Sequence, residues 1–231
     1  EKFGNSFALM CVAWVLSGIL GLVLGIVAGD FKDRLPDRLI RGYALLLAST
    51  PAFWIGLLLL MIFAVWLGWL PFGMNLPAGM TAAEAGIGVR IRHLLLPALT
   101  LGLTGVANIT LHTREKMIAI MESDYVLFAR ARGESSGYIV KRHALRNLVL
   151  PAITLQFGSI SEIFGGSVLV EQVFSYPGLG QAAIDAGLGS DVSLLLAITV
   201  ISTLFVFLGN LVANVLYGVI DPQIRRGRSH G

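Results

Sequence analysis

The sequence has little charge. Only 13% of its 231 residues are Asp, Glu, Lys or Arg, and 55% are hydrophobic, whereas soluble domains carry about 25% charged residues. The mean hydropathy is +0.78. This composition excludes an ordinary soluble domain and predicts a polytopic membrane protein. The net charge of +3 is a weak argument for a nucleic-acid partner, because basic loops on one side of a membrane produce the same sign.

Cysteine and the usual catalytic arrangements are also scarce. Cys11 is the only cysteine, so no internal disulfide can form. The histidines are scattered, and none lies at metal-ligand spacing from a cysteine or a carboxylate; they are His93, His112, His143 and His230. Neither HExxH nor GxxxxGK[ST] occurs. We therefore predict no catalytic residue, no metal site and no resident cofactor in this chain.

Five apolar segments are long enough to cross a bilayer, which takes roughly 18 or more residues. They extend over about 7–29, 43–70, 94–112, 148–170 and 193–220. Each should be a helix, because hydrocarbon offers the backbone no hydrogen-bond partner. The runs are continuous, whereas the strands of a β-barrel alternate. The predicted fold class is an all-α polytopic membrane protein, with a single transmembrane domain over 1–231 and a core at about 5–222.

Basic residues concentrate on one side of the predicted membrane. All but three of the 17 Lys and Arg residues fall after the first, third and fifth segments, and the exceptions are Lys2, Arg90 and Arg92. The positive-inside rule makes the basic side cytoplasmic. The C-terminus is then cytoplasmic and the start of the chain lies outside, which predicts a further transmembrane helix before Glu1.

Glycine and polar residues inside the segments suggest helix packing. Gly21, Gly25 and Gly29 form a GxxxGxxxG row, which lets another helix approach closely. We interpret the polar residues in or near the segments as interhelical hydrogen-bond partners; they are Asn108, Thr110, Gln156, Asn210 and Asn214. Glu162 is a carboxylate well inside a segment, where a charge costs about 2.5–3.5 kcal/mol. A residue of a transport pathway and a protonated or hydrogen-bonded Glu at a helix contact both remain open.

The longest polar interval covers residues 122–151. Within it Tyr125, Ala129 and Gly133 are four residues apart, so they share one face of a helix. Two of them are small, which predicts a face that another protein surface can approach closely. Gly133 also suits a helix end, and a second, basic helix is predicted over about 136–147. A rigid knob at the cytoplasmic face and a solvated loop both fit this pattern.

Two outer loops are predicted, at 71–93 and 171–192. The first is rich in Pro and Gly and should be irregular. In the second, the YPGLG of Tyr176–Gly180 is a turn signal, and GQAAIDAGL then predicts a short helix. This second loop could dock a partner or cover a pathway, or it could be a plain surface turn with a short helix.

Several motifs together resemble a known family. They are TPAFWIGLLLLMIFAVWLGWLPFG, RHLLLPALTLGL, DYVLFARARG, KRHALRNLVLP, GGSVLVEQVFSYPGLG and LYGVIDPQIR. In this order they resemble the permeases of binding-protein-dependent ABC importers, and more narrowly the dipeptide, oligopeptide and nickel branch. The resemblance covers almost the whole chain. It implies the transmembrane domain of a type I importer, which has one further N-terminal helix in this branch.

The resemblance also implies partners and a cargo. A permease of this kind pairs with a second, different permease subunit in the bacterial inner membrane. Two ATP-binding subunits, which hold ATP and Mg²⁺, drive alternating access, and an extracytoplasmic solute-binding protein delivers the solute. Peptides are the expected cargo, with nickel or a metal chelate as the alternative. Membrane lipid surrounds the chain, and no nucleic-acid partner is expected.

In the family, a short coupling helix in the cytoplasmic loop fits a groove of the ATPase. The corresponding coupling loop here is 113–147, and it implies ATPase-coupling roles for Asp124, Ala129, Arg130, Ala131, Gly133 and Glu134. The residues implied to brace the loop are His143, Ala144, Arg146, Asn147 and Pro151, with Pro151 in the first turn of the next membrane segment. Those implied to contact the binding protein are Tyr176, Pro177, Gly178 and Gly180.

This chain departs from the family pattern in two respects. The additional N-terminal helix and outer region of this branch are absent from the sequence, and the general signature is altered. The signature begins Glu-Ala-Ala, whereas Ala129-Arg130-Ala131 stands here, so the contact chemistry shifts from acidic to basic.

Two other classes of protein were weighed. A stand-alone secondary transporter or channel needs an internal repeat or several intramembrane charges, and no clear repeat is visible. A membrane-embedded enzyme needs a convergent nucleophile, base or metal set, which the sequence lacks.

Overall fold

The computed structural model describes residues 1–77, 79–81 and 84–220, with all side chains in these ranges except those of 136, 146, 150 and 216–220. Within this part of the chain the regular structure is entirely helical. The elements are α1 (Lys2–Asp30), α2 (Leu35–Ser49), α3 (Ala52–Leu59), η1 (Leu60–Trp66), α4 (Ile87–Met121), α5 (Asp124–Ala131), α6 (Ser136–Ile139), η2 (Val140–Ala144), α7 (Leu145–Gly158), α8 (Ile160–Val173), α9 (Leu179–Leu188) and α10 (Val192–Ile220), where η denotes a π-helical stretch.

The five predicted segments correspond to three single helices and two bent pairs. In the described part of the chain, α1, α4 and α10 are each long and apolar enough to cross a membrane. The pair of α2 with α3–η1 bends by 109°, and the pair of α7 with α8 bends by 49°. The described residues therefore form three candidate spans, or up to five if each bent pair counts as one.

The second predicted segment, 43–70, is wrong as a single helix. The chain breaks at Thr50, whose φ of −104° and ψ of 127° are extended. Pro51 explains the break, because a proline ring disfavours the helical conformation in the residue before it. The helix that leads to this break also begins earlier than predicted, at Leu35, with a proline in its first turn.

The predicted basic helix at 136–147 does not end where expected. α6, η2 and α7 follow one another without an interruption from Ser136 to Gly158, so the polar loop leads directly into the membrane segment. Pro151 accordingly lies inside α7 and not in the first turn of a new helix. The fourth segment is divided instead at Ser159, where α7 gives way to α8.

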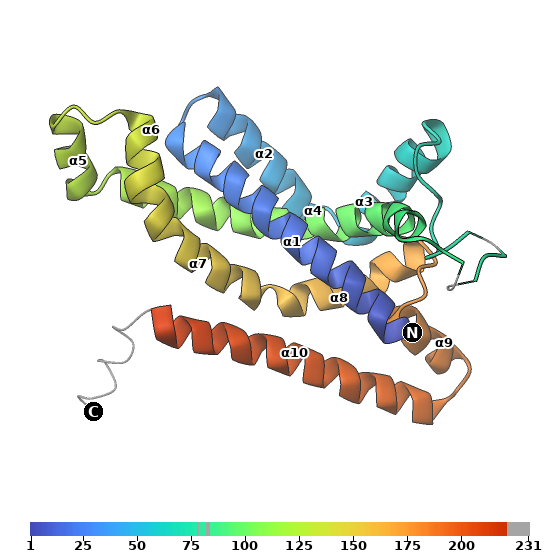
Figure 1. Cartoon of the computed structure of the whole chain (residues 1–231). Coiled ribbons are helices and arrows are strands. Elements are labelled where there is room, and N and C mark those ends of the chain that lie inside the picture. Colours follow the sequence, from blue (N-terminus) through green and yellow to red (C-terminus); the bar gives the residue numbers. More distant parts are fainter. Residues whose placement is uncertain (78, 82–83, 221–231) are drawn as a thin grey trace, which may run out of the picture.

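The closest helix pair is α1 with α4, which run side by side along the bundle (Figure 1). A Cβ atom on Gly25 would lie 2.5 Å from Cβ of Thr113 and 2.8 Å from the carbonyl oxygen of Thr110. Gly21 and Gly29 meet Ile109 and Met117 at similar distances. The packing interpretation of the glycine row is therefore confirmed.

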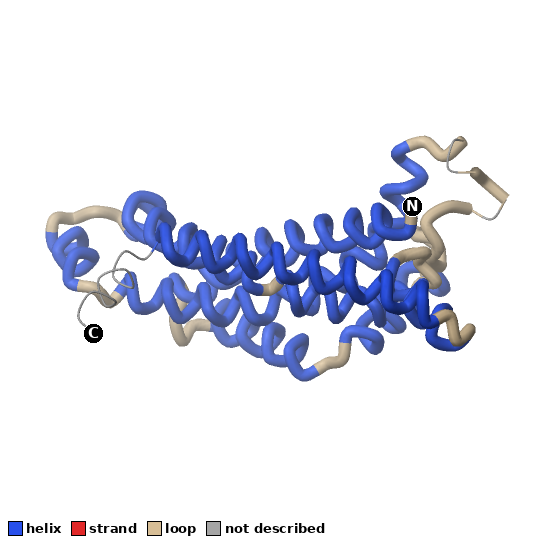
Figure 2. Tube along the Cα trace, turned by 90° about the horizontal axis from the view of Figure 1, so that it is seen from below, coloured by secondary structure: helices blue, strands red, loops and turns tan. Residues whose placement is uncertain are grey.

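The two ends of the bundle carry different loops. Figures 1 and 2 show α5 and α6 at the end of the bundle where α10 finishes. The N-terminus and α9 lie at the opposite end. The loop that follows η1 also lies at the end with α9 (Figure 1). The predicted coupling loop and the two predicted outer loops are thus separated by the length of the helices. The basic residues beyond residue 220, which contributed to the predicted orientation, lie outside the described residues.

The glycine row generates a stability prediction. Gly25→Ala should destabilise the protein by about 1–3 kcal/mol, because an inserted methyl group overpacks the α1–α4 contact. Gly42→Ala is the matched control, since a Cβ there has no atom within 4 Å and helix propensity favours Ala over Gly. Thermal unfolding of the purified protein in detergent measures both. Equal unfolding temperatures for Gly25→Ala and the wild type would contradict the packing argument.

Candidate coupling segment

α5 is a short helix held between a polar turn and a glycine. Ser123, the residue before it, is extended, with φ −73° and ψ 151°. Gly133 follows its last turn with φ +84°, and its N–H donates to the carbonyl of Arg130 over 2.9 Å. A positive φ is easy for glycine and costly for other residues. The predicted helix end at Gly133 is therefore confirmed.

The inner face of α5 is buried in a small hydrophobic cluster. Val126 and Ala129 are fully buried there, together with residues from α4, α6, η2 and α7. The other buried members are Met117, Met121, Ile139, Ala144 and Leu148. α5 is therefore packed against the helices that enter and leave the loop. Since close-packed side chains transmit displacement, a movement of α5 would reach these helices.

The outer face of α5 differs from the predicted one. Ala129 was expected on a close-contact surface, but its side chain is fully buried in the chain's own cluster. The surface is formed instead by Phe128, which is 72% exposed, and Leu127, which is 52% exposed. Asp124, Arg130 and Ala131 are exposed beside them. The predicted common face of Tyr125, Ala129 and Gly133 is therefore wrong, since Tyr125 is exposed, Ala129 is buried and Gly133 lies beyond the end of α5.

Polar contacts connect α5 to the helix that follows it. The Asn147 side-chain amide donates to the Tyr125 hydroxyl over 3.1 Å. His143 Nε2 lies 3.2 Å from Glu134 Oε2, and Arg132 donates to the other oxygen of that carboxylate over 3.1 Å. Glu134, implied as an ATPase contact, thus has two partners within this chain.

A cavity of about 520 Å³ is lined by Tyr125 of α5, Arg142 and His143 of η2, and Asn147 of α7. Of the other residues implied to brace the loop, Ala144 lies in the buried cluster and the side chain of Arg146 is outside the described residues.

A buried ion pair, not predicted from the sequence, fixes the base of this region. Arg114 of α4 donates two hydrogen bonds to the two carboxylate oxygens of Asp37 in α2, over 2.5 and 2.7 Å. The Asp37 side chain is only 1% exposed. Nearby, Lys32 pairs with Glu122 just after α4, and the hydrogen bond that Lys32 donates to that carboxylate raises the pKa of Lys32. The turn between α1 and α2 is thereby tied to the α4–α5 junction through Lys32, and α2 is tied to α4 through Asp37.

The YPGLG turn is also placed differently from expectation. Tyr176, Gly178 and Gly180, implied as contacts for a binding protein, are buried, and Pro177 is partly buried. The backbone N–H groups of Gly180 and Gln181 donate to Glu171 Oε2 over 2.7 and 3.2 Å. The turn therefore attaches α9 to α8, and α9 itself confirms the predicted short helix.

Glu171 is at the centre of the outer attachment, the hydrogen-bonded contact of its carboxylate with Ser6, Gly180 and Gln181. Its side chain is fully buried, and its other oxygen accepts a 2.6 Å hydrogen bond from the Ser6 hydroxyl of α1. That hydroxyl in turn accepts from the Leu179 N–H over 2.7 Å. A Cβ on Gly178 would lie 2.3 Å from this carboxylate, so glycine is required. Burial and the nearby carboxylate raise the pKa of Tyr176 to about 12, which keeps its hydroxyl neutral.

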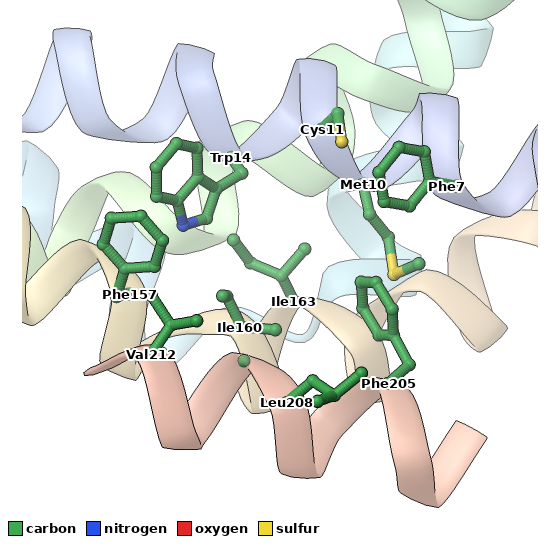
Figure 3. Close-up of a pocket in the computed structure, with 11 residues that line it drawn as sticks. Phe7, Met10, Cys11, Trp14, Phe157, Ile160, Ile163, Phe205, Leu208 and Val212 are labelled. Carbon is green, nitrogen blue, oxygen red and sulfur yellow. The ribbon is translucent and has the colours of Figure 1, made fainter. Parts of the chain in front are cut away.

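Glu162, the open case from the sequence, is exposed on α8 and has no hydrogen bond or ion pair within the described part of the chain. A separate cavity of about 490 Å³ lies between α1, α7–α8 and α10 (Figure 3). Its wall is apolar and includes the aromatic side chains of Phe7, Trp14, Phe157 and Phe205 (Figure 3). The Trp14 indole N–H already donates to the Gln156 carbonyl over 2.7 Å. This cavity offers no charge for catalysis or for a metal.

The outer attachment generates a second prediction. Glu171→Ala leaves the Ser6 hydroxyl and two backbone N–H groups without their acceptor, at about 1–3 kcal/mol for each buried donor. Thermal unfolding should therefore shift to a clearly lower temperature, and protease cleavage around α9 should become faster. Glu162→Ala, on the same helix but exposed, is the control and should change stability by less than about 0.5 kcal/mol. Similar losses in both variants would contradict the assigned role of Glu171.

Comparisons with known proteins agree with this architecture. Residues 21–226 match the family model described as "Binding-protein-dependent transport system inner membrane component". The oligopeptide transport system permease protein AppB of Bacillus subtilis (strain 168) is 36% identical over 223 residues, covering 96% of this chain and 70% of the relative. The glutathione transport system permease protein GsiC of Escherichia coli (strain K12) is 35% identical over 225 residues, covering 97% and 69%.

A solved structure shares the fold. It shows the MetNI methionine ABC transporter in inward-facing conformations, with a TM-score of 0.76, 14% sequence identity and coverage of 95% of this chain and 94% of that chain. At this identity the likeness shows the fold alone. The family match and the two permeases, which cover nearly the whole chain, establish the rest: the chain belongs to the family of binding-protein-dependent transport system inner membrane components and is a permease of an ABC importer.

Proposed function

We propose that this permease carries peptides and that α5 is the element on which its partner ATPase acts. Members of the family work with ATPase subunits and a solute-binding protein in the bacterial inner membrane. The two relatives named above are described as permeases for oligopeptides and for glutathione, itself a short peptide. Di- and oligopeptides are therefore the solute class that the comparisons favour for this chain, with nickel as the alternative to be tested.

The observation that carries the ATPase contact is the exposed apolar face of α5. Phe128 and Leu127 project from a helix whose opposite face is fully buried. They belong to α5, which lies with α6 at one end of the bundle (Figure 1), and Arg130 and Arg132 follow them in the sequence. Exposed large apolar side chains in such a setting mark protein-interaction sites. Phe128 and Leu127, with Asp124, Arg130 and Ala131 around them, would enter the groove of the ATPase.

The contacts that hold α5 in place support the transmission of force. The buried cluster joins α5 to α4 and α7, and the Asp37–Arg114 pair joins α4 to α2. A displacement of α5 by closing ATPases would therefore move several membrane helices together, as packed elements shift in discrete steps. The rest of the assembly follows the family resemblance: a second permease subunit, two ATPases with ATP and Mg²⁺, and a cytoplasmic coupling loop and C-terminus. This chain itself would supply no catalytic site.

Phe128→Ser tests the ATPase contact. Binding of the ATPase should weaken by roughly tenfold or more, because burying a Phe side chain contributes about 1.5–3 kcal/mol. Leu188→Ser is the matched control, since Leu188 is 83% exposed but ends α9 at the opposite end of the bundle. Co-purification with the ATPase and ATP-dependent uptake in proteoliposomes measure the effect. A Phe128→Ser complex that retains its ATPase and imports at the wild-type rate would refute this contact.

The solute class is tested with the same proteoliposomes. Labelled di- and oligopeptides, delivered by the cognate binding protein, should accumulate in an ATP-dependent manner. Uptake of Ni²⁺ in preference to peptides would replace the peptide assignment with the nickel alternative.

A further inference from the structure

A row of polar side chains follows one face of α4. Thr104, Asn108, His112 and Glu115 are spaced by three or four residues, which places them on one side of the helix. Asn108, His112 and Glu115 are exposed, and Thr104 is partly exposed. The opposite side of α4 packs on the glycine row of α1 through Ile109, Thr113 and Met117. The polar row therefore lies on the side of α4 that faces away from α1.

Asn108 does not have the interhelical partner that the sequence predicted. Within the described residues neither Asn108 nor His112 makes a hydrogen bond or an ion pair, whereas the Gln156 amide donates to the Ser17 hydroxyl over 3.1 Å and Asn210 accepts from Ser161 over 3.2 Å. The interpretation as interhelical hydrogen-bond partners is thus confirmed for Gln156 and Asn210 and is wrong for Asn108. Within the described residues it is also wrong for Thr110, whose buried hydroxyl has no partner, and for Asn214, which is exposed without one.

Asn108 is exposed in the middle of an apolar part of α4. It belongs to an uninterrupted run without Asp, Glu, Lys, Arg or His from Leu94 to Leu111. One helical turn, about 5.4 Å, separates it from His112. An unsatisfied polar group costs several kcal/mol in hydrocarbon, so this face should meet water or protein rather than acyl chains.

Other exposed faces of the spans have the opposite character. Val15, Ile19 and Val23 on α1 are exposed and apolar, as are Leu204 and Leu208 on α10; these surfaces suit lipid. Exposed polar groups without a partner occur on α4, on α8 with Glu162 and on α10 with Asn214, and α8 packs against α4. On α4 three exposed polar residues, Asn108, His112 and Glu115, follow one another along one face of the helix.

We propose that the Thr104–Asn108–His112–Glu115 face of α4 is a wall of the water-filled solute pathway, leading a peptide from the membrane interior toward the coupling-loop end. The Asn108 amide can both donate to and accept from the amide groups of a peptide, and His112 and Glu115 extend the polar surface to the end of the span. This assignment rests on the proposed function and adds to it the surface that the solute meets.

Single-cysteine accessibility tests the assignment. Cys11 is the only cysteine of this sequence, so Asn108→Cys or His112→Cys is added to the Cys11→Ser variant of it. Ile19→Cys is the matched control, because Ile19 is 58% exposed on the apolar face of α1. The assembled transporter in proteoliposomes is treated with a charged, membrane-impermeant methanethiosulfonate reagent and, separately, with a lipophilic maleimide.

The charged reagent should modify Asn108→Cys at least about tenfold faster than Ile19→Cys, and saturating peptide with the binding protein should slow the reaction. Reaction with the lipophilic reagent alone would place Asn108 against lipid, and resistance to both reagents would place it against a protein partner; either result overturns the assignment. If Asn108→Cys does not assemble, His112→Cys decides by the same criteria. Co-purification of the ATPase is scored separately, so a failure of the coupling proposal is distinguishable from a failure of the pathway assignment.

Discussion

The burial of Val126 and Ala129 is the contact on which the mechanical account depends. These two side chains fasten an eight-residue helix to α4, η2 and α7. So short a helix is marginal by itself in water, and only tertiary packing gives it a fixed direction. That packing turns Phe128 and Leu127 outward on a firm base. A loop without this cluster could carry the same residues but could not transmit a displacement.

The connections continue from the loop to the far end of the bundle. Arg114 and Asp37 link α4 to α2, and the glycine row holds α1 against α4 along its length. At the opposite end, Glu171 joins α8, α9 and the start of α1 through Ser6. An ABC importer permease must convert movement at one membrane surface into opening at the other. Close packing and a few buried polar contacts supply that stiffness here, while the polar face of α4 stays free.

The sequence predicted the elements better than their directions. Hydropathy located the apolar segments, Gly133 located the C-terminal end of α5, and the YPGLG turn located the start of α9, because these signals are local. Pro51 is also a local signal for the break at Thr50. The long apolar run on both sides of it nevertheless favoured the prediction of a single helix. The inward direction of Ala129 depends on Met117 and Leu148, and the Asp37 pair depends on a residue 77 positions away. Such long-range partners leave no pattern in a single sequence.

The most direct test of the account measures whether α5 moves together with α4. Spin labels would be placed at Lys116 on α4 and at Arg132 just after α5, both exposed, in the Cys11→Ser background, with ATP-dependent uptake showing that the labelled transporter cycles. The account predicts one narrow distance distribution that is the same without nucleotide and with ATP trapped. A distribution that shifts or broadens when ATP binds would show that α5 moves independently of α4, and would contradict the claim that this seated helix transmits force.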